Sequence, residues 1–512
     1  MVIVIDFGSQ YTQLIVRKIR ELGFRSEILP FNTPIEEIIN KKPGAIILSG
    51  GPRSVTEKNA PTINPLIWTL GIPLLGICYG MQLISQQFGG KVASSPTKEY
   101  GSSLLVLNKY LHDESPLFKD VPSQDTVWMS HGDYISSLPS SFTAYASTES
   151  CPFAAMGNPE KRIYGVQFHP EVTHTHSGKK ILHNFLSVVA GLKPDWSIKS
   201  YLEEITSSIK AFVGEGKVIV ALSGGVDSTI MITLLSKTLP GQIYPIFIDH
   251  GLLRFQEADE VLQALAKLGI PVNLVNAQDR FFKALKKVKD GEKKRKIMGR
   301  EFIMVLEAEA QKIPGVTHLA QGTIYPDVIE SAVSVSGLAA KIKTHHNVGG
   351  LPKRLRLKLV EPLRYLFKDE VRELGKLLGL PLSIIERRPF PGPGLAVRML
   401  GEVTMDRANK LRMVDEIFRD ELKKWEGYKN IWQAFAVLTG VKTVGVKGDE
   451  RSYEELVAIR AVSSTDGMTA DWIEIPPAVL RKISERITRE VAGVNRVVYD
   501  ITTKPPSTIE WE

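Results

Sequence analysis

Short apolar runs alternate with amphipathic segments over the first 190 residues of the chain. Apolar runs at residues 2–5, 45–48 and 73–77 predict strands, and residues 11–22 and 81–88 have the spacing of helices. Strands that alternate with helices predict a mainly parallel sheet with helices on its faces. The first third of the chain is therefore expected to form one α/β unit.

The end of this unit and the start of the next are marked by a change in composition. Residues 163–168 predict a late strand, residues 178–189 predict the helix that follows it, and glycine and proline at 191–196 predict a linker. A predicted helix at 198–212 then opens a second alternation. Its predicted strands are residues 218–222, 243–248, 272–275 and 318–321. This second unit is also expected to be doubly wound.

Two later stretches interrupt the alternation. Residues 334–352 carry serines, glycines and paired histidines with little periodicity, which is typical of a long functional loop and predicts a lid. Dense proline and glycine at residues 388–394 predict a break. Helices predicted at 406–425 and 477–491 stand among strands in the final part of the chain.

The length agrees with several domains, because 512 residues exceed what one hydrophobic core supports. The predicted fold class is α/β, with three domains in all. They are a doubly wound, mainly parallel-sheet domain at residues 1–196, a second such domain at 197–387 and a smaller α+β domain at 388–512.

Composition predicts a soluble protein of a reducing compartment. No apolar run reaches the roughly 18 residues that a membrane helix needs, and the N-terminus reads as a strand, not as an export signal. Two cysteines, Cys78 and Cys151, are too few for a disulfide framework, so a cytoplasmic location is expected. The net charge of +8 suits anionic nucleotides, and neither a nucleic-acid nor a membrane partner is expected.

A cysteine flanked by glycines marks the first candidate reactive centre. In the run Gly-Ile-Cys-Tyr-Gly at residues 76–80 a predicted strand turns into a predicted helix, which is the pattern of a nucleophile elbow. Such a turn exposes the thiol of Cys78, and a helix N-terminus favours the thiolate. The alternative is a buried structural cysteine, which is how Cys151 is interpreted.

A thiol nucleophile needs a base and a group that orients the base. His169 and Glu171 follow the strand predicted at 163–168, where an extended backbone aims side chains two positions apart in the same direction. The alternative is a metal site of His169, His174 and His176, which matches no zinc spacing and leaves the thiol without a role.

Main-chain N–H groups near the predicted thiol are candidates for an oxyanion site. Gly50 and Gly51 follow another predicted strand end, and Tyr79 directly follows the cysteine. Their N–H groups are predicted to bind the oxyanion that forms when the thiolate attacks a carbonyl.

A glycine-rich turn marks the second candidate reactive centre. Ser-Gly-Gly-Val-Asp-Ser at residues 223–228 joins a predicted strand to a predicted helix, so its N–H groups form a cradle for phosphate. The loop lacks the lysine of a Walker A sequence. Asp227 is predicted to hold Mg²⁺ against the phosphates, because magnesium prefers hard oxygen ligands. The alternative is an ordinary glycine turn with a serine or aspartate cap.

These motifs resemble those of known families. Residues 1 to about 190, with Gly-Ile-Cys-Tyr-Gly-Met-Gln and Phe-His-Pro-Glu, resemble a class I glutamine amidotransferase domain. The Ser-Gly-Gly-x-Asp-Ser loop is similar to that of the N-type ATP pyrophosphatases. As a whole the chain resembles the glutamine-hydrolysing GMP synthase family, most specifically at residues 342–352, 388–395 and 504–512.

The resemblance implies an activity and its partners. Cys78 would attack glutamine, His169 would move protons and Glu171 would orient His169. The released ammonia would aminate XMP after ATP had adenylated it, so that GMP, AMP, pyrophosphate and glutamate are the products. Glutamine, ATP and XMP are the implied small molecules, and Mg²⁺ is the implied cofactor.

The resemblance also implies further site residues. Lys343 in the predicted lid would stabilise charge on the adenylated intermediate. The implied ATP contacts are Ser223, Gly224, Gly225, Val226, Asp227, Ser228 and Thr229. The implied XMP contacts are Arg295, Gln433, Asp449, Lys504 and Glu510. The last domain resembles the dimerisation domain of the family, so a homodimer is expected.

Two rival functions use the same motifs. One is a tRNA-modifying enzyme with the same ATP chemistry, for which the basic charge would be an RNA footprint. The stretches at 342–352 and 504–512 speak against it. The other is a nucleotide-sensing protein without chemistry, which the presence of Cys78, His169 and Asp227 disfavours.

Overall fold

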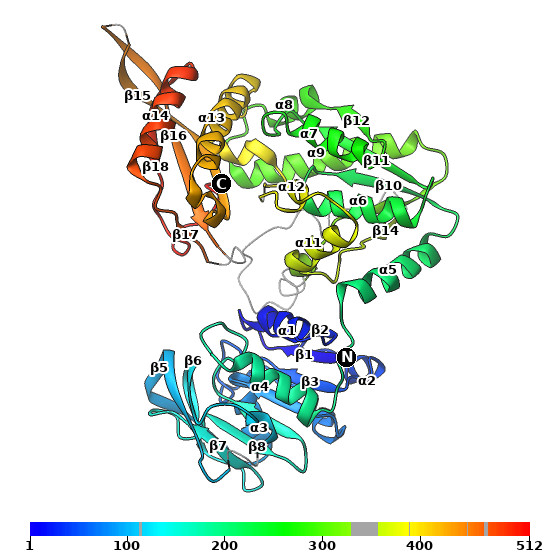
Figure 1. The fold of residues 1–512 in the computed structure, drawn as a ribbon, viewed down its shortest axis with the longest axis vertical. Coiled ribbons are helices and arrows are strands. Elements are labelled where there is room, and N and C mark those ends of the chain that lie inside the picture. Colours follow the sequence, from blue (N-terminus) through cyan, green and yellow to red (C-terminus); the bar gives the residue numbers. More distant parts are fainter. Residues whose placement is uncertain (112–114, 329–356, 389, 448, 465–468) are drawn as a thin grey trace. The chain divides into compact units, whose positions relative to one another are not determined.

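The computed structural model describes residues 1–111, 115–328, 357–388, 390–447, 449–464 and 469–512. The chain divides into two compact units (Figure 1), one built on residues 1–201 and the other on residues 202–325 and 357–512. Each unit has its own sheets and its own core, and each is described by itself.

The first unit is built on a nine-stranded sheet in the order β2-β1-β3-β4-β9-β8-β7-β5-β6. Its strands are β1 (Val2–Asp6), β2 (Ser26–Pro30), β3 (Ala45–Leu48), β4 (Leu74–Ile77), β5 (Lys91–Leu107), β6 (Gln124–Ser137), β7 (Thr143–Ser147), β8 (Ala155–Asn158) and β9 (Ile163–Val166). The five strands from β2 to β9 pair in parallel, and the other pairs are antiparallel. The central strands β3 and β4 are buried along their whole length, which explains their continuous apolar runs.

The helices of this unit include the three that the periodicity predicts, at residues 11–22, 81–88 and 178–189, and one, α2 at residues 35–40, that was not predicted. They are α1 (Thr12–Glu21), α2 (Ile35–Asn40), α3 (Tyr79–Gln87) and α4 (Gly178–Asn184), with short helical turns η1 (Pro65–Thr69), η2 (Pro116–Phe118) and η3 (Phe185–Val189). Helix α3 packs against β4 and β9, so its first residue lies at the end of the parallel strands. The long antiparallel strands β5 and β6 were not predicted, because their polar alternation lacks the apolar runs used to find the others.

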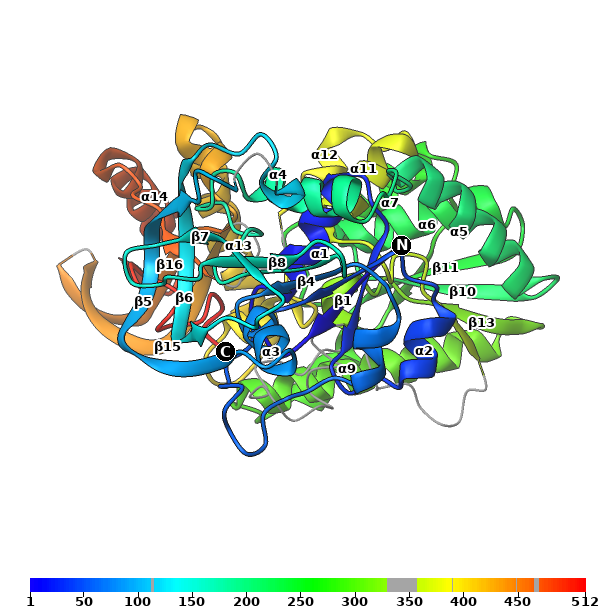
Figure 2. The ribbon, with the colours of Figure 1, turned by 90° about the horizontal axis from the view of Figure 1, so that it is seen from below.

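The second unit contains a five-stranded parallel sheet in the order β12-β11-β10-β13-β14. The strands are β10 (Lys217–Leu222), β11 (Ile243–Asp249), β12 (Asn273–Asn276), β13 (Val316–Ala320) and β14 (Lys358–Val360). The helices are α5 (Ile198–Val213), which begins at the end of the first unit, α6 (Val226–Thr238), α7 (Glu257–Lys267), α8 (Gln278–Leu285), α9 (Gly291–Gln311), α11 (Lys368–Leu377) and α12 (Leu382–Ile385). Helices α6 and α9 lie on opposite faces of this sheet (Figures 1 and 2).

The same unit carries a second, smaller sheet near the C-terminus, in which β16 pairs with β15, β17 and β18. Its strands are β15 (Gln433–Lys447), β16 (Glu450–Ser463), β17 (Asp471–Trp472) and β18 (Val494–Tyr499), with helices α13 (Met405–Lys423) and α14 (Pro477–Glu490) and short turns η4 (Gly394–Arg398) and η5 (Glu426–Asn430).

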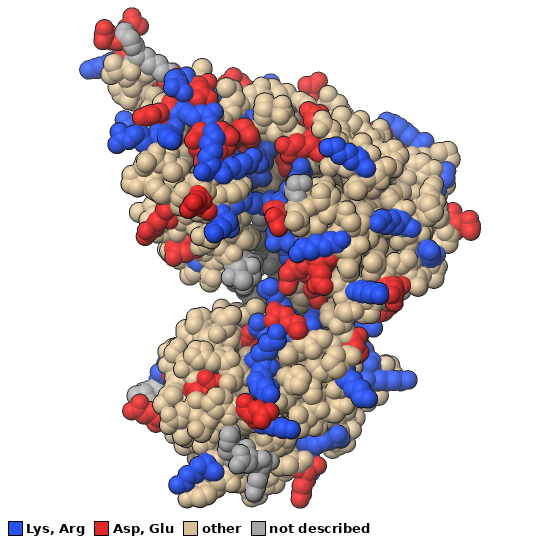
Figure 3. Space-filling view, viewed as in Figure 1, with Lys and Arg blue, Asp and Glu red and all other residues tan. Residues whose placement is uncertain are grey.

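Basic and acidic side chains are interspersed on the face of the chain that is drawn in Figure 3.

One hydrophobic core joins the two sheets of the second unit. It contains Ile219 and Ile246 from the parallel sheet, Leu395 from the connecting turn, and Phe418 and Ile459 from the C-terminal part. The predicted α/β fold class is confirmed. The predicted boundary at residue 388 falls inside this shared core and stays a prediction.

Two further expectations concern the membrane and the lid. Within the described part of the chain, no helix combines the length and the hydropathy needed to cross a membrane. The predicted lid at 334–352 lies outside the described residues, and so does Lys343.

Candidate active site

Cys78 sits on a strained turn between β4 and α3. Its φ is 52° and its ψ is −105°, a region that non-glycine residues rarely adopt, and Tyr79 is the first residue of the helix. A Cβ added to Gly76 would lie 2.5 Å from the carbonyl carbon of Gly80, and one added to Gly80 would meet the backbone of Leu48. The two glycines are therefore required by close packing around the elbow.

The sheet brings His169 and Glu171 to the same end as the thiol. Strand β9 pairs in parallel with β4, with Ile77 beside Val166, so the residues after both strands meet at one edge. His169 Nδ1 lies 2.7 Å from Glu171 Oε1, and both side chains are buried. The carbonyl oxygen of His169 accepts a hydrogen bond from Thr175 Oγ1 at 2.7 Å, which holds the turn in place.

The charge of Glu171 controls the protonation of His169. Burial disfavours the imidazolium, but the Glu171 carboxylate and hydrogen bonds with Cys78 and Glu171 outweigh it, so the pKa of His169 lies well above its usual value. A protonated imidazole beside a sulfur favours the thiolate.

The three predicted oxyanion donors lie around the same centre. A Cβ added to Gly50 would be 3.1 Å from His169 Cε1, and one added to Gly51 would be 3.3 Å from Tyr79 Cγ. The main chain at Gly50 therefore approaches the imidazole of His169 closely, and the main chain at Gly51 approaches the ring of Tyr79. The N–H of Tyr79 belongs to the first turn of α3, where a helix provides no acceptor of its own.

Two glutamines that the sequence analysis missed also lie in this site. Gln167 Nε2 is 3.5 Å from Cys78 Sγ, and Gln82 Nε2 is 3.2 Å from Gln167 Oε1. Gln167 could have been found from the sequence, because it stands two residues before His169 on an extended segment. Nothing in the spacing pointed to residue 82.

The alternative metal site of three histidines is not assembled. The ring of His174 packs on Trp128 at 4.5 Å, and His176 is mostly exposed beside Asp125. Among the described residues, no group of three or more histidine, cysteine, aspartate or glutamate side chains is placed to hold a metal ion. The other cysteine, Cys151, is fully buried, and burial raises the pKa of its thiol to about 12.

The predicted phosphate cradle joins β10 to α6. Gly224 has a φ of 77°, and Gly225 precedes the first helical residue, Val226. Hydrogen bonds tie the loop to the helix: Ser228 Oγ and Thr229 Oγ1 each donate to the carbonyl oxygen of Gly225 at 3.0 Å. The loop therefore presents the N-terminus of α6 to an anion.

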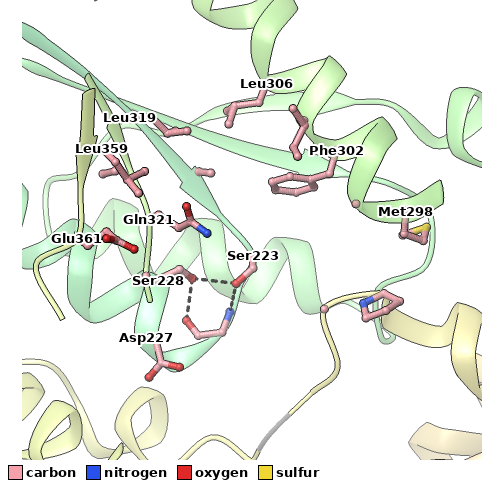
Figure 4. Close-up of a pocket in the computed structure, with 18 of the residues that line it drawn as sticks. Ser223, Asp227, Ser228, Met298, Phe302, Leu306, Leu319, Gln321, Leu359 and Glu361 are labelled. Atoms are coloured by element: carbon pink, nitrogen blue, oxygen red, sulfur yellow. Dashed lines mark hydrogen bonds between the residues drawn. The ribbon is translucent and has the colours of Figure 1, made fainter. Parts of the chain in front are cut away.

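A cavity of about 460 Å³ opens beside this loop (Figure 4). Ser223, Asp227 and Ser228 form its polar end. Its apolar lining includes Met298, Phe302, Leu306, Leu319 and Leu359. An apolar cavity with a polar end at a helix N-terminus is a candidate site for an anionic ligand.

A lysine not found from the sequence pairs with the predicted metal ligand. Lys368 Nζ, at the start of α11, lies 2.6 Å from both carboxylate oxygens of Asp227. Asp227 and Glu361 are carboxylates that line the cavity. Their oxygens are hard donors next to the phosphate cradle, so the residues present fit Mg²⁺ shared with phosphate.

Four of the five predicted XMP contacts lie in or against the C-terminal end of the chain. Glu510 accepts two hydrogen bonds from Arg398, at 2.8 and 3.1 Å, and one from Gln433 Nε2 at 2.8 Å. Arg295 donates to the C-terminal Glu512. Lys504 exchanges two main-chain hydrogen bonds with Ala470.

Asp449 lies apart from these residues. It occupies the turn between β15 and β16 with a φ of 66°, next to the final pair Lys447 and Glu450. Strand β15 runs for 14 steps from Gln433 to Lys447, which is about 45 Å at roughly 3.3 Å per residue. One nucleotide cannot contact Gln433 and Asp449 of the same chain.

Comparison with known proteins decides the family. The family model "Glutamine amidotransferase class-I" matches residues 3–189, and "GMP synthase C terminal domain" matches residues 420–511. A protein named GMP synthase (glutamine-hydrolyzing) from Carboxydothermus hydrogenoformans is 54% identical over 514 residues, covering 100% of this chain and 99% of the relative. Relatives of the same name from Thermosipho melanesiensis and Aquifex aeolicus are 52% and 53% identical, with the same coverage. The chain belongs to the glutamine-hydrolysing GMP synthase family.

The two family models fall on separate parts of this GMP synthase family chain. The first covers the strained cysteine and the His169–Glu171 pair, and the second covers α14 and the strands from β15 to β18. The phosphate cradle at 223–228 lies between them. The sequence-based assignment to the GMP synthase family is confirmed.

Proposed function

We propose that the two centres of this chain carry the two halves of one reaction, with Cys78 releasing ammonia from glutamine and the 223–228 loop binding ATP. As a GMP synthase the chain is a ligase that forms GMP with glutamine as the amido donor. The observation that supports the residue roles best is the buried hydrogen bond between His169 and Glu171 beside a strained cysteine.

In the first half reaction, the Cys78 thiolate attacks the carboxamide carbon of glutamine. The carbon–nitrogen bond breaks, ammonia leaves with a proton from His169, and a glutamyl thioester remains. His169 then takes a proton from water, which attacks the thioester and releases glutamate and the thiol. Glu171 holds the imidazole in its orientation throughout, and the N–H groups of Gly50, Gly51 and Tyr79 receive the oxyanion.

In the second half reaction, ATP lies in the cavity with its phosphates on residues 223–229. The carbonyl oxygen of XMP attacks the α-phosphorus, and pyrophosphate leaves. Ammonia then displaces AMP from the adenylated carbon, which gives GMP. Asp227, with Glu361 nearby, would hold Mg²⁺, which neutralises phosphate charge when bound. Lys368, which pairs with Asp227 in this structure, is placed to move to phosphate.

The XMP site is proposed to include Arg295, Gln433, Lys504 and Glu510. The first three bring donors, and Glu510 is already oriented by Arg398, which is fully buried. Arginine suits a nucleotide phosphate because its planar donors match phosphate oxygens. Lys343, by family resemblance, would stabilise the adenylated intermediate.

The chain is also proposed to act as a homodimer, with Asp449 reaching the nucleotide site of the partner subunit. Strand β18 pairs with β16 only from Glu455 to Ile459, so the part of the β15–β16 hairpin nearer its turn is not paired with β18. That part exposes Val444, Val446 and Tyr453. Val444 and Tyr453 are paired across the strands and share one face. An exposed apolar face at the end of a 45 Å hairpin is suited to a second copy, which would bring Asp449 to a site that its own chain cannot offer it.

The remaining proposals concern organisation and place. Three functional domains, at 1–196, 197–387 and 388–512, would separate ammonia release, ATP chemistry and dimerisation. A cytoplasmic location agrees with two free cysteines in 512 residues.

The test is product analysis with purified chain, XMP, ATP and Mg²⁺. Glutamine should support formation of GMP, AMP and pyrophosphate in equal amounts, and ammonium chloride should replace glutamine. UTP and tRNA, offered in place of XMP, should release no pyrophosphate above background. Pyrophosphate release that depends on tRNA and not on XMP would overturn the proposal.

A further inference from the structure

The sulfur of Cys78 contacts two polar groups besides the imidazole of His169. The carbonyl oxygen of Ser130 lies 3.7 Å from Sγ, where it can accept from a thiol, and the Nε2 of Gln167 lies 3.5 Å from Sγ, where it can donate to a thiolate. Gln167 is fully buried. Burying an amide costs free energy unless its N–H and C=O groups are hydrogen-bonded. The partners of the Gln167 amide therefore have to be identified.

The orientation of the Gln167 amide is determined by a second glutamine. Gln82 Nε2 donates to the carbonyl oxygen of Asp133 at 2.9 Å, and because that oxygen only accepts, the NH₂ group of Gln82 must face it. The same NH₂ group donates to Gln167 Oε1 at 3.2 Å. The Gln167 amide therefore has its oxygen toward Gln82, and its N–H groups are left to face the sulfur.

Both glutamines stand on the elements that position the nucleophile. Gln82 lies one helical turn after Cys78, and its N–H donates to the carbonyl oxygen of Cys78 at 3.1 Å. Gln167 directly follows β9, which pairs with β4, and its own N–H donates to the carbonyl oxygen of Ala154 at 2.9 Å. The donor is thus held relative to Sγ by the helix and the sheet that form the elbow.

We propose that Gln167 is a further catalytic residue of glutamine hydrolysis, a fixed hydrogen-bond donor that stabilises the Cys78 thiolate, and that Gln82 is its positioning residue. The proposal rests on the proposed role of Cys78 as the nucleophile. The roles of Gln167 and Gln82 are additional to those proposed above for the cysteine, the histidine and the glutamate.

A neutral amide remains a hydrogen-bond donor throughout the reaction, which a second titratable group would not. His169 must give and take a proton during the reaction, so its hydrogen bond to the sulfur changes with each step. An amide N–H does not titrate, so it offers the sulfur the same donor at every stage. A hydrogen bond to an anion is stronger than one to a neutral acceptor, so the donor favours the thiolate over the thiol. It also offsets the Ser130 carbonyl oxygen, which favours the thiol.

The test compares the full-length protein with Gln167→Met, which keeps the side-chain volume and removes the donor. The rate of alkylation of Cys78 by iodoacetamide is followed against pH by mass spectrometry of the Cys78 peptide. Loss of one hydrogen bond to a charged group predicts a midpoint about one pH unit higher, alkylation about tenfold slower below that midpoint, and a kcat for glutamine hydrolysis about tenfold to hundredfold lower. The KM for glutamine and the ammonia-dependent formation of GMP should stay near normal.

Asn184→Leu is the matched control. Asn184 is a buried amide of the same unit, and it donates to the carbonyl oxygens of Leu117 and Lys119, away from the thiol. This variant should lower the melting temperature without moving the alkylation midpoint. An equal shift of the midpoint in Asn184→Leu would assign the effect to general loosening and overturn the proposal.

Gln82→Leu keeps the proposal testable if Gln167→Met does not fold. It should change the same quantities in the same direction by a smaller factor. Where Gln167→Met does fold, the double variant should be no worse than Gln167→Met, because Gln82 acts through Gln167. Normal alkylation and hydrolysis in the folded Gln167→Met protein would overturn the proposal and leave the role of Cys78 intact. Glutamine hydrolysis that survives Cys78→Ala would instead overturn the proposed function.

Discussion

The two reactive centres of this chain differ in how much of their chemistry is present before any substrate arrives. Around Cys78 the proposed catalytic residues are buried, with His169 only 3% exposed and hydrogen-bonded to Glu171, and the backbone of Cys78 is strained. Around the 223–228 loop, Ser223 and Gly225 are exposed at the edge of an open cavity, and the acid of the loop is neutralised by Lys368. The proposed groups of the first centre are already in contact with one another, whereas the carboxylate of the second is paired with a lysine of the protein.

Two buried histidines show the physical basis of this difference. His169 has a carboxylate partner at 2.7 Å, and its pKa is raised in spite of its burial. His250, which lines the cavity beside the 223–228 loop, has no carboxylate hydrogen-bonded to its ring among the residues that the structure describes, and burial lowers its pKa to about 4. Proton transfer requires the first environment. Binding of a polyanion by a neutral imidazole and backbone N–H groups is compatible with the second.

The largest expected effect separates the two centres completely. Cys78→Ala removes the only proposed nucleophile, so glutamine-dependent GMP formation should fall by at least about 10³-fold. Ammonia-dependent formation should remain, because the ATP centre is untouched. Cys151→Ala is the matched control, since Cys151 is the other buried cysteine, and it should leave both activities near normal. Loss of both activities in folded Cys78→Ala protein would contradict the division into two centres.

The second prediction tests the ATP centre with a substitution that should impair the ATP chemistry and leave the cysteine centre unchanged. Asp227→Asn removes a carboxylate charge from the phosphate cradle, so XMP-dependent pyrophosphate release should fall by about 10²- to 10³-fold with either nitrogen donor. Alkylation of Cys78 by iodoacetamide should be unchanged and serves as the internal control. Pyrophosphate release at the normal rate would remove Asp227 from the proposed metal site.

A third, smaller effect concerns the raised pKa of His169. Glu171→Gln removes the negative charge that outweighs burial, so the pKa of His169 should fall and glutamine hydrolysis should drop by about 10²-fold at pH 7. The residual rate should rise with pH, since the thiolate must then form without an imidazolium beside it. A pH profile parallel to that of the unaltered protein would contradict this account of the pair.

The smallest effect concerns acid stability of the first unit. Burial raises the pKa of Glu99, but hydrogen bonds from His131, Ser103, Ser150 and Thr148 outweigh it and lower the pKa to about 2. A carboxyl whose pKa is lowered by folding adds stability above its unfolded value, near 4.5, and that stability is lost as the pH falls toward 2.

Glu99→Gln should therefore destabilise β5 and β6 by about 1–3 kcal/mol at pH 7. It should also flatten their loss of stability between pH 4.5 and pH 2. Hydrogen exchange of peptides from these strands, corrected for the intrinsic rate at each pH, measures both. Ser136→Ala, at the exposed end of β6, is the control, and it should leave the pH dependence unchanged. An equal pH dependence in Glu99→Gln would contradict the assignment.

Motifs with a local geometric cause were predictable from the sequence. The elbow at 76–80 and the cradle at 223–228 need glycines at particular positions, and the structure places a strand before and a helix after each of them. The central parallel strands β1, β3 and β4 were found because burial on both faces requires continuous apolar residues. Strands β5 and β6 escaped prediction because one of their faces is polar.

Contacts between distant residues were not predictable in the same way. The resemblance grouped Asp449 with Gln433, and only the length of β15, about 45 Å of extended chain over 14 steps, shows that they stand at opposite ends of one long strand. Lys368 carried no local signal, although its ammonium meets Asp227 across 141 residues of chain.

By itself the sequence determined the alternation of strands and helices, the two glycine-rich turns and the family, because each depends on residue types at short spacing. Only the tertiary structure decided which groups face the sulfur and the phosphate cradle. The amides of Gln82 and Gln167 are 85 residues apart and meet because parallel strands β4 and β9 end side by side. Such pairings depend on sheet order and side-chain orientation, which one-dimensional patterns do not contain.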